Sequence, residues 1–287
     1  MIDRHGLVGI WHRPYIDLEP LLDLGALDEV HEEICLGLAT VDVELTGGGL
    51  TSMGVTSPSV RRDPYLDYGE AIAALTPDER RRFLSLADEP ELFDPDELTA
   101  ATFGDETDHP LSRAQELWLS YAKGVYFPWK VAYHFVENDR WDDKHSGAGK
   151  SFGAEAERVF PKTVRFLRGL PFREIGRCLV FGLAANDHAP VHRDAEPGQS
   201  LSTLHAMSIC PARNKRFFLT DPTETHELCV PSRAYWFNEA DYHGVHADPF
   251  FRYSIRVDGV FDDAFFAELS RRHGAAVRGA RKRTPSR

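Results

Sequence analysis

The sequence predicts a mainly β fold with flanking helices, in which a jelly-roll core follows a largely helical N-terminal region. Its second half is dense in β-branched and aromatic residues, and turn residues such as those at 211–214 and 221–222 interrupt it at short intervals. Short strands at this spacing are typical of an antiparallel sandwich. The expected strands cover residues 178–183, 189–194, 204–210, 216–220, 227–230, 234–237 and 250–261.

Helical patterns dominate the chain before residue 172. Apolar residues recur at helical spacing over residues 18–38, and residues 111–125 and 152–170 have the same character. The segment Thr76-Pro77-Asp78-Glu79 has the residues of a capping box, with proline at the first helical position. A closing helix is expected over residues 262–272.

The organisation favours one domain over residues 1–287. Residues 1–172 would form the helical region and a lid, residues 173–262 the core, and residues 263–287 the last helix with a basic tail. We find no repeat and no segment composed like a linker. Three aromatic residues of the lid could line a site or pack in the core: Trp129, Tyr133 and Trp141. The basic tail is typical of a solvated end, with a docking segment as the alternative.

Charge and cysteine content exclude several classes of protein. The net charge is −12, so neither nucleic acid nor an anionic membrane is an expected partner. The four cysteines form no CxxC pair, and three lie in apolar, strand-like stretches where a free thiol is usually buried. The sequence shows neither a signal peptide nor a membrane span. These features predict a soluble, cytoplasmic protein.

Two potential metal ligands stand two residues apart in an expected strand, at His192 and Asp194. Residues i and i+2 of a strand point to the same face, so an imidazole and a carboxylate would project together. Such a pair is weak evidence alone. Two histidines with one carboxylate leave three positions of an iron ion open, so a second histidine is required.

A candidate for that histidine is His243, which lies 49 positions after Asp194. Nine positions later comes Arg252, in a strand whose alternate residues form an unusually polar face. Arg252 and Ser254 share this face, and a guanidinium with a nearby hydroxyl suits a carboxylate.

This order of residues resembles the Fe(II)/2-oxoglutarate-dependent dioxygenase superfamily. The likeness covers residues 192–257, and the spacing is also similar to that of aspartyl/asparaginyl β-hydroxylase-like enzymes. The resemblance implies a double-stranded β-helix core with Fe(II) held by His192, Asp194 and His243. It further implies that Arg252 and Ser254 bind the distal carboxylate of 2-oxoglutarate.

The resemblance also implies an activity: hydroxylation of an unactivated C–H bond in a small amino-acid-like or peptidyl substrate, with succinate and CO2 as co-products. Desaturation or ring formation by the same oxidant stays open. Related halogenases have a small residue in place of the carboxylate ligand, so Asp194 argues against halogenation. Three residues are candidates for contacts with the substrate: Arg256, His205 and Asn186.

Several alternatives stay open at this point. His246 is also at a plausible distance from Asp194, although His243 fits the family spacing better. His188 shares the face of His192 and would support the ligands or end the strand. A cupin-type isomerase or dioxygenase without 2-oxoglutarate is a second class, which the Arg252–Ser254 pair disfavours. A non-catalytic interaction protein on the same scaffold is the third. The sequence does not indicate an oligomeric state.

Overall fold

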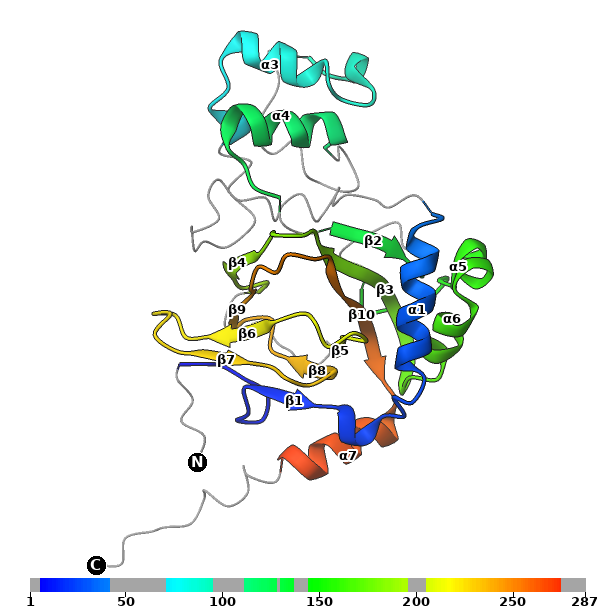
Figure 1. The fold of residues 1–287 in the computed structure, drawn as a ribbon. Coiled ribbons are helices and arrows are strands. Elements are labelled where there is room, and N and C mark those ends of the chain that lie inside the picture. Colours follow the sequence, from blue (N-terminus) through cyan, green and yellow to red (C-terminus); the bar gives the residue numbers. More distant parts are fainter. Residues whose placement is uncertain are drawn as a thin grey trace, which may run out of the picture.

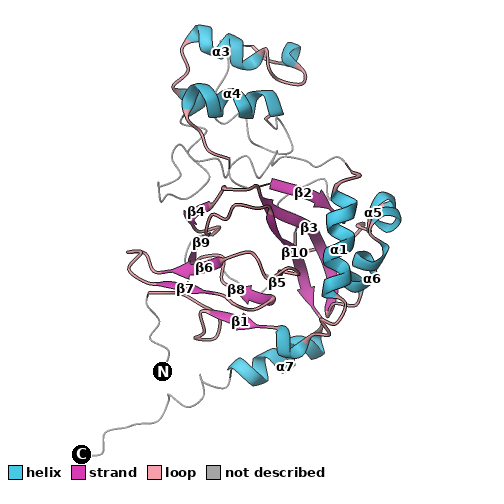
Figure 2. Ribbon diagram, in the orientation of Figure 1, coloured by secondary structure: helices cyan, strands magenta, loops and turns pink. Residues whose placement is uncertain are grey.

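Two antiparallel β-sheets face each other at the centre of the molecule, and helices cover the outer side of the larger one (Figure 1; Figure 2). The computed structural model describes residues 6–41, 71–94, 111–127, 130–136, 144–195 and 205–274. The prediction of a mainly β protein with flanking helices is therefore confirmed.

The large sheet has six strands in the order β1-β8-β5-β10-β3-β2, and all its neighbours are antiparallel. β10 lies at its centre, paired with β3 on one side and β5 on the other. Their bounds are β1 Tyr15–Asp17, β2 Lys130–His134, β3 Phe172–Leu183, β5 His205–Ile209, β8 Ala234–Phe237 and β10 Arg252–Phe261.

The small sheet has four antiparallel strands in the order β4-β9-β6-β7. They are β4 Ala189–His192, β6 Phe217–Thr220, β7 Glu227–Cys229 and β9 Tyr242–Val245. From β3 onward the chain passes repeatedly between the sheets: β3, β5, β8 and β10 belong to the large one and the other four to the small one. Residues distant in sequence are thereby brought face to face between the sheets.

The alternation of β10 explains how the two faces of the large sheet differ. Tyr253, Ile255 and Val257 are buried in the outer core, where helices cover the sheet. The intervening residues point toward the small sheet, as the period of two requires. Helices α1 Leu27–Leu38, α5 Ala154–Val159 and α6 Pro161–Arg168 contribute apolar residues to the same outer core, and α7 Asp263–His273 closes it.

Helices α3 Pro77–Leu84 and α4 Arg113–Lys123 pack on each other around a separate apolar cluster. The expected capping box of α3 is confirmed, because the Thr76 hydroxyl accepts from the backbone N–H of Glu79 and the Glu79 carboxylate accepts from the N–H of Thr76. α4 begins with an equivalent box between Ser112 and Gln115. Both helices are therefore fixed at their N-terminal ends by local side chains.

Several boundaries differ from the sequence prediction. The expected helix over residues 18–38 is reduced to a single turn, Glu19–Leu21, and α1. The helix expected over residues 152–170 is divided at Phe160, where Pro161 begins α6. β1 and β2 extend the large sheet from a region predicted as helical, and β9 was not predicted. These short strands are specified by pairing with neighbours and not by their own sequence.

Other sequence predictions concern cysteines, aromatic residues and membranes. All four cysteines are free; Cys178 and Cys210 are buried as expected, whereas Cys229 is exposed on β7. Trp129, Trp141 and the part of the basic tail beyond residue 274 lie outside the described residues. Among the helices that the structure describes, none combines the length and apolar character needed to cross a membrane.

Candidate metal centre and its cavity

The structure brings His192, Asp194 and His243 together between the sheets. β4 and β9 pair so that His192 and His243 are cross-strand partners, and their ring centroids are 4.3 Å apart. One potential ligand atom from each of the three residues lies within 4.8 Å of the others. β4 ends at His192, and Asp194 is held just beyond it because its backbone N–H donates to the Glu239 carbonyl at 2.9 Å.

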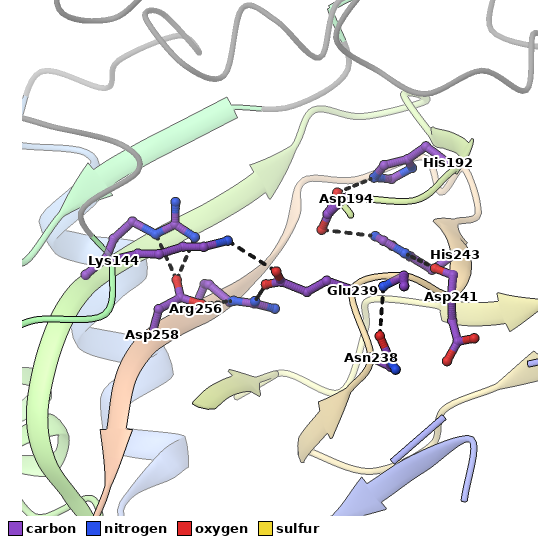
Figure 3. Close-up of polar contacts among 11 residues, drawn as sticks. Lys144, His192, Asp194, Asn238, Glu239, Asp241, His243, Arg256 and Asp258 are labelled. Atoms are coloured by element: carbon purple, nitrogen blue, oxygen red, sulfur yellow. Dashed lines mark hydrogen bonds and ion pairs between the residues drawn. The ribbon is translucent and has the colours of Figure 1, made fainter. Parts of the chain in front are cut away.

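Both imidazoles are oriented in the same way. Nδ1 of His192 lies 2.7 Å from the Pro190 carbonyl oxygen, and Nδ1 of His243 lies 2.9 Å from that of Asp241. A carbonyl accepts only from N–H, so each Nδ1 carries the proton and Nε2 has the free lone pair. The Nε2 atoms face the Asp194 carboxylate at 3.4 and 3.6 Å (Figure 3). The donor atoms are therefore oriented in advance toward one point.

Burial and charge set the ionisation of these groups. Burial, aided by the neighbouring His192, lowers the pKa of His243 to about 4, so its imidazole is neutral at physiological pH. Burial alone would raise the pKa of Asp194, but His243, His192 and Lys144 outweigh it and hold the pKa well below the usual range. A neutral His243 imidazole and an ionised Asp194 carboxylate are the forms that bind a divalent cation.

Gly244 allows the strands around the ligands to approach closely. A Cβ at this position would lie 2.7 Å from the Phe218 ring and 2.9 Å from the Ala189 carbonyl oxygen. Any side chain here would therefore force β9 away from β4 and β6. Such a shift would separate His243 from His192.

The three residues line a cavity of about 90 Å³ between the two sheets. This volume exceeds what a single water molecule needs. Its walls are apolar side chains of both sheets, and its polar groups come from several strands and from the segment containing Lys144. The lining residues are Lys144, Arg177, Leu179, Phe181, Ala189, His192, Asp194, Ser208, Lys215, Phe217, Tyr235, Phe237, Glu239, His243, Val245, Ser254 and Arg256.

Lys215 introduces a cation into this cavity. Its ammonium donates to the Ser254 hydroxyl at 2.8 Å and lies 5.5 Å from the centre of the Phe181 ring. Burial lowers the pKa of Lys215 to about 8. Within the part of the chain that the structure describes, no carboxylate forms an ion pair with this ammonium. Among the described residues, this desolvated charge contacts a hydroxyl and an aromatic ring.

Beside the metal-ligand cluster of His192, Asp194 and His243 lies a series of linked buried ion pairs, here called the ion-pair chain (Figure 3). Arg177 binds Asp258 through Nε at 2.8 Å and Nη2 at 2.6 Å. Arg256 joins Asp258, through Nε at 2.8 Å, to the Glu239 carboxylate. Lys144 lies 3.2 Å from the other oxygen of Glu239. The Glu239 carbonyl also accepts from the backbone N–H of Asp194. The ion pairs are therefore connected to the metal-ligand cluster.

The structure does not place Arg252 in the cavity, contrary to the expectation that it binds a co-substrate. Its side chain is fully buried. Nη1 donates to the Ala184 and Phe250 carbonyls at 3.0 and 3.2 Å, while Nη2 donates to those of His246, at 3.0 Å, and Asp187. Its terminal N–H groups are thereby taken by the backbone of the two loops that follow β3 and β9. Ser254, in contrast, lines the cavity as expected.

Of the three residues expected to contact the substrate, one lines the cavity and two do not. Arg256 lines the cavity, but its guanidinium already binds Glu239 and Asp258. His205 lies on the outer core, stacked on Phe261, whose backbone N–H donates to its Nδ1 at 2.8 Å. Asn186 is exposed in the turn after β3, with a φ of 66°. His205 and Asn186 therefore do not line the cavity that contains His192, Asp194 and His243.

The two histidines left open by the sequence lie elsewhere. His246 stacks on Phe218, and its Nε2 is 3.0 Å from a Glu227 carboxylate oxygen on β7. His188 stacks on Tyr126, whose hydroxyl donates to the His188 carbonyl at 2.9 Å. The geometry thus groups His243, and neither of these, with His192 and Asp194.

Residues near the N-terminus support the segment that carries His243. The Asp241 carboxylate accepts from the backbone N–H groups of Val8 and Gly9, the latter at 2.8 Å. The Asp241 carbonyl is the acceptor for His243 Nδ1. Asp241 therefore connects the first described residues to a candidate metal ligand.

Comparisons with known proteins find resemblance only among solved structures. No family model matches the chain, and no curated protein sequence does. A 2OG-Fe(II) oxygenase family oxidoreductase from Burkholderia pseudomallei is 14% identical, with 46% of this chain and 68% of that one covered and a TM-score of 0.28. AviO1 from Streptomyces viridochromogenes Tue57 is 12% identical, with 68% and 89% covered and a TM-score of 0.26.

A third solved structure is a prolyl hydroxylase from Trichoplax adhaerens, in complex with a peptide fragment of the oxygen degradation domain of hypoxia inducible factor. It is 14% identical, with 69% of this chain and 94% of that one covered and a TM-score of 0.25. At these scores the likeness does not assign the chain to a family. The chemistry has to be argued from the cavity itself.

Proposed function

We propose that this chain is an Fe(II)/2-oxoglutarate-dependent oxygenase, a single domain with a jelly-roll core of the double-stranded β-helix type. The observation that carries the proposal is one cavity containing both a His–Asp–His cluster and a desolvated lysine that no described carboxylate pairs with. The first feature fits a divalent metal, and the second fits an anionic co-substrate. The passage of the chain from sheet to sheet over β3–β10 supports the jelly roll.

The donor set fits iron. His192, Asp194 and His243 offer two imidazole nitrogens and a carboxylate from one side, and such a set leaves positions open for further ligands. Both imidazoles have the tautomer that a metal requires, because backbone carbonyls accept from Nδ1. These three residues would hold the ion.

The cavity also fits 2-oxoglutarate, with Lys215 in the role that the sequence suggested for Arg252. An incoming carboxylate would accept from the Lys215 ammonium and the Ser254 hydroxyl, which already lie 2.8 Å apart. The charge-assisted bonds would be strong because the surroundings are desolvated. Arg252 has its terminal N–H groups satisfied by four carbonyls and would instead hold the wall of the site.

When bound, iron and 2-oxoglutarate would, with O2 as co-reactant, supply an oxidant able to remove hydrogen from an unactivated C–H bond; one oxygen atom of O2 would enter succinate, formed with CO2, and the other the hydroxylated product. The chain's own residues bind, orient and exclude water. Phe217, Phe237 and Val245 form apolar walls around the cluster and limit the access of water. With Asp194 at the carboxylate position, hydroxylation is proposed over halogenation. The substrate is proposed to be small, amino-acid-like or peptidyl.

Lys215 also separates this proposal from its alternatives. A cupin-type isomerase or dioxygenase needs the metal but no anion clamp, and a non-catalytic scaffold needs neither. Burying an ammonium so that its pKa is lowered opposes folding. Binding of an anionic co-substrate would explain why a lysine is present at this buried position.

The test is an anaerobic titration of metal-free protein with Fe(II) and then 2-oxoglutarate. A weak visible charge-transfer band is expected only when both are present. His243→Ala should abolish it, and the matched variant His246→Ala should retain it, because His246 lies beside Glu227 on β7. If well-folded wild-type protein gives no band, the proposal is wrong.

A further inference from the structure

Two groups of cations lie at different levels along the inner face of β10. Lys215 lies beside Ser254 and is the first of these groups. The second group begins two residues further along β10, at Arg256, and extends to the cations around Asp258. Alternate residues of a strand are spaced by about 7 Å, so the Lys215 level and the Asp258 level are about 14 Å apart along the strand. If Lys215 binds the co-substrate, the second group of cations serves another purpose.

That second group is the ion-pair chain, and its members are not equivalent. Arg256 is bound on both sides, by Asp258 and by Glu239, so it aligns carboxylates and has little capacity for a ligand. Lys144 is at the end of the chain. Its ammonium is 3.2 Å from Glu239, its side chain retains 19% exposure, and it lines the cavity. Among the described residues, Glu239 is the one carboxylate that pairs with Lys144.

The charges of the described residues around the cavity do not balance. Four described cations lie on its wall: Lys144, Arg177, Lys215 and Arg256. They face three carboxylates, which are Asp194 and Glu239 on the wall and Asp258 behind it. A divalent metal would add two positive charges and 2-oxoglutarate two negative ones. Counted over the described residues, the loaded site would then keep one positive charge, in surroundings where uncompensated charge is costly.

We propose that the Lys144 end of the cavity is the substrate subsite and that it takes the carboxylate of a small organic monoanion. This inference rests on the proposed function, since it assumes that Lys215 is occupied by the co-substrate. Lys144 binds the carboxylate, while Arg256 fixes Glu239 so that Lys144 is held over the cavity. The metal-ligand cluster adjoins this end through the bond from Asp194 to the Glu239 carbonyl.

The charge count also distinguishes between kinds of substrate. A free amino acid is a zwitterion with no net charge and would leave the site positive. A phosphate monoester carries close to two negative charges near neutral pH, which exceeds the single positive charge of the loaded site. A carboxylic acid without a free amine, such as an acylated amino acid or a peptide C-terminus, supplies the single charge.

The test uses protein with Zn(II) in place of Fe(II) and saturating 2-oxoglutarate, whose binding is followed by its proton signals. Fluorine NMR then detects binding of trifluoroacetate, trifluoroacetamide and trifluoroethylammonium, which are close in size but differ in charge. Saturable line broadening is expected for trifluoroacetate alone. Lys144→Gln should weaken its binding at least fivefold and leave the affinity for 2-oxoglutarate unchanged.

The matched control is Lys162→Gln, which also removes a lysine paired with a glutamate, Glu29, but on the exposed surface of α6. It should bind trifluoroacetate like the wild type. Equal broadening by the amide, equal binding by Lys144→Gln, or no broadening at all would each overturn the inference. Competition with acetate, glycine and methylphosphonate completes the test: acetate should displace the probe best, and a stronger effect of glycine or methylphosphonate would contradict the monoanion.

If wild-type protein fails to bind 2-oxoglutarate, the proposed function is wrong, and the Lys144 comparison still decides whether an anion binds at that end. If 2-oxoglutarate binds normally but trifluoroacetate binding does not depend on Lys144, only the substrate inference fails. The two failures are therefore distinguishable in one sample.

Discussion

Arg252 and Lys215 are two inward cations whose surroundings differ. Arg252 donates its terminal N–H groups to four backbone carbonyls and has Asp248 3.6 Å from its Nε. Lys215 donates to the Ser254 hydroxyl, and no described carboxylate pairs with it. Burial lowers the pKa of both groups. Among the described residues, Arg252 therefore has more hydrogen-bond acceptors than Lys215 to replace the water lost on burial.

The difference shows how a structural cation is distinguished from a ligand-binding one. A guanidinium whose terminal N–H groups all donate to backbone carbonyls stabilises loops, and removing it leaves part-buried acceptors without donors. An ammonium held by one hydroxyl gives the folded chain little, and its replacement by an apolar group of similar length costs little or stabilises. Arg252, which the sequence pattern singles out, is therefore a poorer candidate than Lys215 for binding the co-substrate.

The largest expected effect is that of Arg252→Met on stability. Four part-buried carbonyls would lose their donor, so the free energy of unfolding should fall by about 3–5 kcal/mol. Urea denaturation measures the change. The control Arg216→Met removes an exposed arginine that also pairs with Asp248 and should change stability by less than about 1 kcal/mol. Loss of 2-oxoglutarate binding by Arg252→Met at unchanged stability would reverse the roles of Arg252 and Lys215.

Lys215→Met should do the opposite. We expect stability to be equal or higher and the affinity of the Zn(II) protein for 2-oxoglutarate to fall about 100-fold, since a desolvated charge pair is lost. Isothermal titration calorimetry measures the affinity. Lys123→Met, which removes a lysine paired with Glu79 near the surface, should bind like the wild type. Unchanged affinity in Lys215→Met would remove the basis of the co-substrate site.

The pH dependence of binding gives a smaller, graded effect. The pKa of Lys215 is lowered to about 8, so in the unbound protein the ammonium loses its proton above that pH. A neutral amine attracts a carboxylate weakly, so affinity for 2-oxoglutarate should fall up to about tenfold per pH unit above pH 8. Lys215→Met should show no such slope between pH 8 and 9.5. An equal slope in both proteins would mean that another group titrates.

The smallest effect is expected for Ser254→Ala. Loss of one hydroxyl that bonds a charged group should weaken 2-oxoglutarate binding about tenfold at most, because the Lys215 ammonium remains. The same titration measures it, with Ser232→Ala, in a surface turn before β8, as the control. A loss as large as that of Lys215→Met would indicate that Ser254 positions the ammonium as well as contacting the ligand.

The sequence predicted the metal-ligand cluster better than the co-substrate site, for a physical reason. Strand periodicity puts His192 and Asp194 on one face of an expected strand, and the spacing to His243 completes the set. The structure groups the three residues, with His192 and His243 on neighbouring paired strands. The same periodicity puts Arg252 on the inner face of β10. It does not reveal that the long side chain reaches the carbonyls of two loops.

Lys215 and Lys144 could not be found by local reasoning. Each follows residues typical of a turn or loop, where a lysine is usually exposed. Only pairing between distant strands brings Lys215 to Ser254, 39 positions later, and Lys144 to Glu239, 95 positions later. β1 and β2 were missed for the same reason, because short strands at the edges are defined by the sheet they join.

The bonds from Val8 and Gly9 to Asp241 have a consequence for folding. They join parts of the chain separated by more than 230 positions, and the same aspartate orients His243. Contacts between such distant residues form late, since a long loop must close first. During synthesis the ribosome must add both of these distant segments before the last candidate ligand is fixed. Metal capture would thus accompany the final stage of folding and would not nucleate it.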